Sequence, residues 1–207
     1  FVYKARTTTP APTRSEVSQE LKPVQAFIEG CINTVGTEGI IKLGSHGGYI
    51  DPYDPYLSGR SFIMDPQKQY ESDFAYLSSD VPESSVAYWY YSFTEGNCIN
   101  CAMMSQTPYI DEMERQLSVY ISENIDACLQ NFTMFTAKGA VIDHAEDFSV
   151  RTTIRENDVV FEAVYELNIT EETRKSSMDK YYTTVDIPLQ KYYLMALNIT
   201  ANEYQTG

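Results

Sequence analysis

The strongest constraint on the fold is an alternation of apolar and polar side chains in the last third of the chain. It occurs in three successive segments, at residues 148–155, 159–169 and 181–187. A period of two turns one side of each strand towards a core and the other towards solvent, which is typical of antiparallel sheets. Asn157-Asp158 and a polar stretch at 171–178 supply the turns. The sequence therefore predicts a three-stranded antiparallel meander.

The segments before this alternation have a helical period. In residues 23–44, Pro23 suits a first helical turn, and apolar side chains recur three and four residues apart. We expect Gly36 and Gly39 to weaken the end of this helix and Gly44 to serve as its C-cap. The apolar stripe comprises Val24, Phe27, Ile28, Cys31, Ile32 and Val35.

A second helix is expected from Thr107, as N-cap, to about Phe135, and the segment 189–204 is also more helical than extended. Helices that precede strands without β-α-β alternation indicate an α+β fold. We therefore expect two or three helices on one face of a mainly antiparallel sheet, within a single domain over residues 21–207.

Residues 45–108 are rich in Tyr, Asp, Ser and Pro, with a turn cluster at 51–56. Short strands are expected near 49–50 and 86–93, within a long loop region that is a candidate functional surface. Its aromatic side chains could stack on sugars or bind a protein, and they could equally fill a small core. The candidate binding residues are Tyr53, Tyr56, Tyr88, Trp89 and Tyr90.

The first 20 residues differ in composition from the rest. The chain begins with Phe1 and has a Thr/Pro-rich tract at 7–13, which is typical of an extended, glycosylated stalk. Aromatic and basic residues at 1–6 suit the flank of a membrane anchor. We expect residues 1–20 to be a neck that follows a removed N-terminal anchor, and the C-terminus to be truncated as well.

Cys31 and Cys128 fall on the apolar stripes of the two long helices. If these helices pack antiparallel, a disulfide would close a loop of about 97 residues and contribute about 4–5 kcal/mol. Two free buried thiols are the alternative. Cys98 and Cys101 are expected to form a local disulfide in the loop region. Redox catalysis is less favoured because no strand precedes the pair and no helix begins at it.

Charge and sequons indicate the compartment. The chain has 15 Lys+Arg, 29 Asp+Glu and a net charge of −14, which disfavours nucleic acid and anionic membranes as partners. Sequons at Asn131, Asn168 and Asn198, together with four cysteines, indicate a location outside the cytoplasm.

No catalytic motif is recognisable, and no cofactor or metal site is expected. His46 and His144 are the only histidines and lie in separate loops, which leaves little for zinc or a nucleophile pair. The acidic groups at 51/54 and 143/146/147 could act as hydrolase carboxylates, although acidic loops are usually only solvated. A secreted or surface hydrolase, or a carbohydrate-active enzyme, is therefore the alternative function.

Three segments carry a family resemblance: VQAFIEGC at 24–31, LGSHGGYI at 43–50 and ISENIDACL at 121–129. This arrangement resembles the ectodomains of uncharacterised membrane-anchored surface proteins of DPANN-type archaea, over roughly residues 20–190. The resemblance implies Cys31 and Cys128 as a shared pair, and the Cys98/Cys101 loop departs from the pattern. The expected function is a non-enzymatic, anchored cell-surface ectodomain for adhesion, cell–cell contact or filament assembly, with protein or glycan partners.

Overall fold

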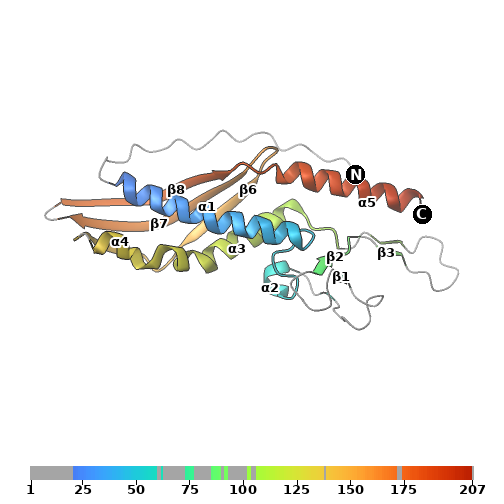
Figure 1. The fold of residues 1–207 in the computed structure, drawn as a ribbon, viewed down its shortest axis with the longest axis horizontal. Coiled ribbons are helices and arrows are strands. Elements are labelled where there is room, and N and C mark those ends of the chain that lie inside the picture. Colours follow the sequence, from blue (N-terminus) through green and yellow to red (C-terminus); the bar gives the residue numbers. More distant parts are fainter. Residues whose placement is uncertain are drawn as a thin grey trace.

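The fold is α+β, as predicted: two long helices cover one face of an antiparallel sheet (Figure 1). This computed structural model describes residues 21–59, 62, 73–76, 85–89, 91–92, 102–103, 106–137, 139–171 and 174–206. The expected neck at 1–20 lies outside the described residues.

The main sheet has four strands around β7 (Val159–Glu171). Along one side of β7 runs β8 (Arg174–Val185), and its other side is shared by β6 (Ser149–Ile154) and β5 (Val141–His144). All pairs are antiparallel, which confirms the predicted meander of β6, β7 and β8. The strand β5 was not predicted, because its four residues are mostly exposed and show no alternation.

β8 begins at Arg174, so the prediction of a turn over 171–178 was wrong. Lys175 and Ser177 are polar but pair with Thr170 and Asn168 of β7. A ladder of backbone hydrogen bonds does not require apolar side chains on a face that is open to solvent. Only Met178 and Tyr181 are buried in this part of the strand, so the alternation is weak there.

Alternation along β7 divides the sheet into a covered face and an open face. Residues 161, 163, 165, 167 and 169 are buried, whereas residues 164, 166 and 168 are exposed. Helix α1 (Lys22–Ser45) lies against β8, and α3 (Ile110–Leu129) lies against β6. The core therefore sits between these two helices and one face of the sheet.

The expected weakening of α1 by Gly36 and Gly39 stays a prediction, but the helix continues through both glycines, and they permit close packing. A Cβ atom at Gly36 would overlap the ring of Phe161, and one at Gly39 would lie 2.9 Å from Cδ1 of Tyr120. Gly44 is not the C-cap: α1 continues to Ser45 and is capped by His46. The chain then turns at Gly47 and Gly48, whose φ angles are 70° and 94°.

The second long helix begins later and ends earlier than predicted. Its N-cap is Tyr109, whose N–H donates to Glu112 over 2.8 Å, and not Thr107. After Leu129, three consecutive residues at 130–132 have left-handed φ angles, and a short helix α4 (Thr133–Thr136) follows. This break turns Phe132 into the core, where its ring lies 6.2 Å from that of Phe27.

Both helices also cover parts of the sheet edges. On β6, the N–H of Thr152 donates to Ser118 over 3.0 Å, and the N–H of Ile154 donates to Glu114 over 2.9 Å. On β8, Asn33 of α1 donates to the carbonyl of Thr184 over 3.1 Å. These side chains satisfy backbone groups that an added strand would otherwise pair with.

The predicted C-terminal helix is present as α5 (Leu189–Thr206). The loop region contains a short helix α2 (Pro55–Ser58), and β1 (Phe74–Tyr76) pairs with β2 (Ser85–Ala87). A second pair consists of β3 (Tyr91–Ser92) and β4 (Ala102–Met103). The strand predicted near 49–50 is absent, because the N–H of Ile50 donates over 3.0 Å to the side chain of Gln116 on α3 and not to a neighbouring strand.

Candidate functional site

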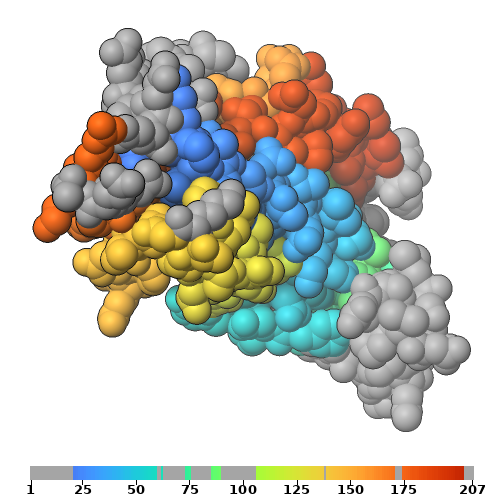
Figure 2. Space-filling view, turned by 60° about the vertical axis from the view of Figure 1, so that its left-hand side comes forward, coloured from blue at the N-terminus to red at the C-terminus, as the bar shows by residue number. Residues whose placement is uncertain are grey.

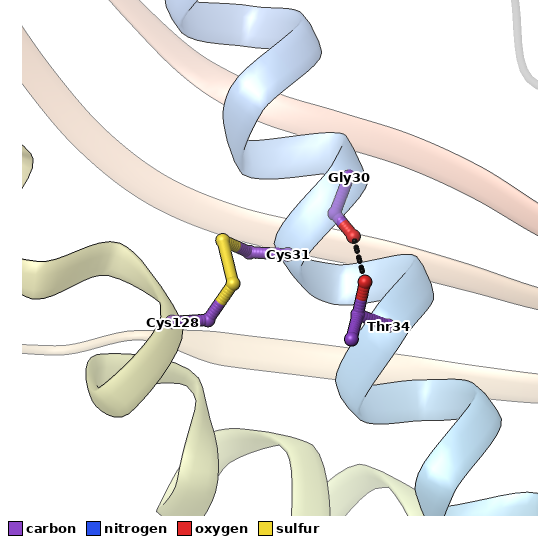
Figure 3. The surroundings of a disulfide bond; sticks show 4 residues. All are labelled: Gly30, Cys31, Thr34 and Cys128. Atoms are coloured by element: carbon purple, nitrogen blue, oxygen red, sulfur yellow. Dashed lines mark hydrogen bonds between the residues drawn. A yellow bond between two sulfur atoms is a disulfide. The ribbon is translucent and has the colours of Figure 1, made fainter. Parts of the chain in front are cut away.

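The two long helices run in opposite directions and are joined by the Cys31–Cys128 disulfide (Figures 1 and 3). The Cα atoms of the two cysteines are 5.7 Å apart. Cys31 is buried on the face of α1 that meets α3, while Thr34, one turn further along, donates to the carbonyl of Gly30 over 3.0 Å (Figure 3). The alternative of two free thiols is therefore wrong. Cys98 and Cys101 lie outside the described residues.

Two of the predicted binding tyrosines lie together at the surface, on and beside α2. Asp51 accepts from the N–H of Tyr53 over 2.8 Å, and Asp54 caps α2 by accepting from the N–H of Tyr56 over 2.8 Å. Tyr53 is 40% exposed and Tyr56 is 74% exposed. Figure 2 shows the cyan α2 segment at the surface, beside the yellow part of α3.

Helix α2 is held on α3 by Arg115. Its guanidinium donates to the carbonyl of Tyr56 over 3.2 Å and to that of Leu57 over 2.6 Å. Leu57 is buried beneath these bonds. The exposed tyrosines therefore stand on a fixed support, which lowers the entropy lost when a partner orders them.

A small apolar cluster of three aromatic residues and one alanine lies under Tyr53. We call it the loop core, and it consists of Tyr49, Phe62, Phe74 and Ala87. The ring of Phe62 lies 4.9 Å from that of Tyr49 and 4.8 Å from that of Phe74. Tyr53 lies nearly parallel to Phe74, with 6.3 Å between ring centroids. The aromatic residues of this region thus both fill a core and form a surface.

Trp89 and Tyr88 are less exposed than the tyrosines on and beside α2. Both are half-buried, and the indole N–H of Trp89 donates to the carbonyl of Gly47 over 2.6 Å. Its ring lies 5.7 Å from that of Tyr193 on α5. Trp89 therefore links the Gly47 turn to α5 and is not an exposed stacking residue. Tyr90 lies outside the described residues.

All three sequon asparagines are exposed, in different settings. Asn131 is in the left-handed turn between α3 and α4. Asn168 projects from the open face of β7, as its place on the polar side of the predicted strand implied, and Asn198 is on α5. Each side chain has the exposure that a surface glycan needs.

A histidine–tyrosine contact that sequence reasoning missed joins β5 to β7. The hydroxyl of Tyr165 lies 2.9 Å from Nδ1 of His144, and Phe132 packs against both rings. Burial, and then the charge of Asp126, raise the pKa of Tyr165. No sequence signal pointed to this contact, because β5 was not predicted and His144 was expected in a loop.

Of the acidic residues considered for catalysis, Asp51 and Asp54 have structural roles, whereas Asp143, Glu146 and Asp147 are exposed. Asp51 and Asp54 hold backbone N–H groups of the α2 segment. Among the described residues, no group of three His, Cys, Asp or Glu side chains is placed to hold a metal ion. Within the same residues, no helix has the length and apolar character needed to cross a bilayer.

Comparisons with known proteins give no identification. No protein-family model matches this chain, and neither the curated proteins nor the solved structures give a significant match.

Proposed function

We propose that this chain is the non-enzymatic ectodomain of a membrane-anchored cell-surface protein, which binds protein or glycan partners. The observation that carries the proposal is the Cys31–Cys128 disulfide within the main core. Structural disulfides persist in oxidising compartments outside the cytoplasm. The three exposed sequon asparagines and the net charge of −14 agree with such a location.

The binding surface in this proposal is formed by Tyr53 and Tyr56. Tyrosine offers a large, rigid contact area with a polar end, and it is common among the residues that dominate binding energy. Before a partner arrives, Arg115 holds the backbone of Tyr56, and the ring of Tyr53 lies against Phe74 of the loop core. This geometry suits stacking on a sugar ring or packing against a protein surface.

The hydrolase alternative gains no support from Asp51 and Asp54. Asp51 and Asp54 accept hydrogen bonds from backbone N–H groups of their own loop. Their oxygens stabilise the surface on which the tyrosines stand, so we assign them a structural role.

Location is tested by treating intact cells of the native source with a membrane-impermeant, amine-reactive biotin reagent. We expect the chain to be labelled, while a cytoplasmic marker in the same cells stays unlabelled. Protection of the chain until the cells are lysed would overturn the proposed location.

Binding is tested with the purified chain on immobilised glycans and on intact source cells. The variant Tyr53→Ala/Tyr56→Ala should weaken binding by about tenfold or more, as expected for central aromatic contacts. Met134→Ala is the matched control, because it removes an exposed apolar side chain from α4. Equal binding by both variants would exclude the α2 tyrosines as the binding surface.

A further inference from the structure

Helix α5 has an exposed apolar stripe that the proposed function does not use. Tyr192, Met195 and Ile199 are 57%, 60% and 55% exposed. They follow one another at spacings of three and four residues, so they lie on one side of the helix. This spacing equals the a-d-a seam of a two-helix coiled coil.

Helix α5 is held by the rest of the chain near its start. Leu189 is buried, Tyr193 packs on Trp89, and the ammonium of Lys191 lies 2.7 Å from the side-chain oxygen of Asn157. Beyond Tyr193, no residue of α5 whose burial is described is buried, and the helix continues past the end of the sheet (Figure 1).

Such a helix needs packing to be stable. Most helical stability in proteins comes from tertiary packing of an apolar face, and short isolated helices are marginal in water. The exposed stripe is therefore the surface through which α5 can gain that stability.

Charge favours a second copy as the partner. The chain carries 29 acidic residues, yet α5 contains only one, at position 203 near its end, and one Lys, Lys191, near its start. Two copies that meet at this stripe in opposite directions bring Lys191 of one copy level with position 203 of the other, whereas contact through acidic surfaces would be opposed by charge repulsion. The same stripe on both copies is also self-complementary, as a two-fold interface requires.

We infer that α5 of one copy of this chain packs against α5 of a second copy, antiparallel and about a two-fold axis. A crossing at the level midway between Met195 and Ile199 places Met195 of one copy against Ile199 of the other. It also keeps the two Lys191 ammonium groups at opposite ends of the interface. The inference rests on the proposed function and deepens it, because it names the protein partner as a second copy of this chain.

The test measures the mass of the purified 207-residue chain, without a glycan at Asn198, by sedimentation over a range of concentrations. The expected result is a monomer–dimer equilibrium in which Ile199→Glu raises the dissociation constant about a hundredfold, because a two-fold interface carries each substitution twice. Ile41→Glu is the matched control, since Ile41 is 62% exposed on α1, and it should leave the equilibrium unchanged. Helical circular dichroism should fall on dilution of the unmodified chain but not of the Ile199→Glu variant.

Each other outcome overturns the inference. The unmodified chain could stay monomeric, or Ile199→Glu could dimerise as tightly as Ile41→Glu. A monomer that floats with zwitterionic lipid vesicles through Ile199 would assign the stripe to a membrane. A chain that dimerises only after residues 1–20 are removed would assign the stripe to that segment.

If Ile199→Glu lowers the melting temperature of the core, the double variant Met195→Ser/Ile199→Ser replaces it in the same measurement. Cell-surface labelling is a separate measurement, so failure of the location and failure of the dimer are distinguishable.

Discussion

The helix–sheet body and the loop region between α1 and α3 are built in contrasting ways. The body has long elements, a continuous core and a disulfide between its two helices. The loop region has strands of two or three residues and a loop core of four residues. It is also held from outside, by Arg115 and Gln116 of α3. The body can therefore be stable by itself, whereas the loop region depends on the body.

Removal of the disulfide should have the largest effect on the body. Cys31→Ser/Cys128→Ser releases a loop of 97 residues, and the free energy of unfolding should fall by about 4–5 kcal/mol in the chain-entropy model. Urea denaturation of the oxidised chain and of the variant measures the difference. An unchanged transition would mean that the disulfide adds nothing to the body.

Truncation of the loop core should separate the two regions. Phe74→Ala removes a fully buried ring and should cost about 3 kcal/mol, the lower end for such changes. We expect hydrogen exchange to accelerate at β1, β2 and α2 but not in β7. Equal acceleration in β7 would show that the two regions unfold as one unit, which would contradict the independent stability of the body.

A methyl group added to α1 should show how tightly the body is packed. Gly36→Ala forces the buried ring of Phe161 to move, so it should cost about 1–3 kcal/mol. Gly30→Ala is the control, because nothing lies within 4 Å of the added Cβ. That control should instead gain up to about 1 kcal/mol from helix propensity. Thermal melts of both variants measure these opposite signs, and equal melting temperatures would contradict the tight contact.

Alkaline pH should weaken the body through Tyr181. Burial raises the pKa of its phenol above the ordinary value of 10.0. Above pH 10 the unfolded chain therefore loses this proton before the folded chain does, and stability falls as the pH rises. Tyr181→Phe should reduce that slope by up to about 1.4 kcal/mol per pH unit, the value for one proton. Denaturation at pH 9, 10 and 11 tests this, and identical slopes for the two chains would contradict it.

The body was largely predictable from the sequence because its elements have a clear period. The stripes of α1 and α3 and the alternation of β7 gave the layers, and the positions of Cys31 and Cys128 on those stripes gave the disulfide. What could not be predicted depends on distant contacts. The neighbouring residues in the sequence do not indicate that Gly36 contacts Phe161. They also do not indicate that a left-handed turn brings Phe132 to Phe27.

The candidate site was only partly predictable, for the same reason. Composition marked the tyrosines as a group, but it could not separate Tyr56, which is exposed, from Trp89, which bonds to the Gly47 carbonyl. That division depends on how the loop folds onto α3 and α5. The stripe on α5 was visible as a helical pattern, but its exposure required knowledge of where the sheet ends.

The hydrogen bonds between the sheet edges and Ser118, Glu114 and Asn33 have a consequence for copies of the chain that lie close together. A protein displayed densely meets its neighbours constantly, and open strand edges would convert such encounters into irreversible sheet growth. At Thr152, Ile154 and Thr184 that route is blocked by the chain's own helices. A neighbouring copy therefore cannot add a strand through these three backbone groups.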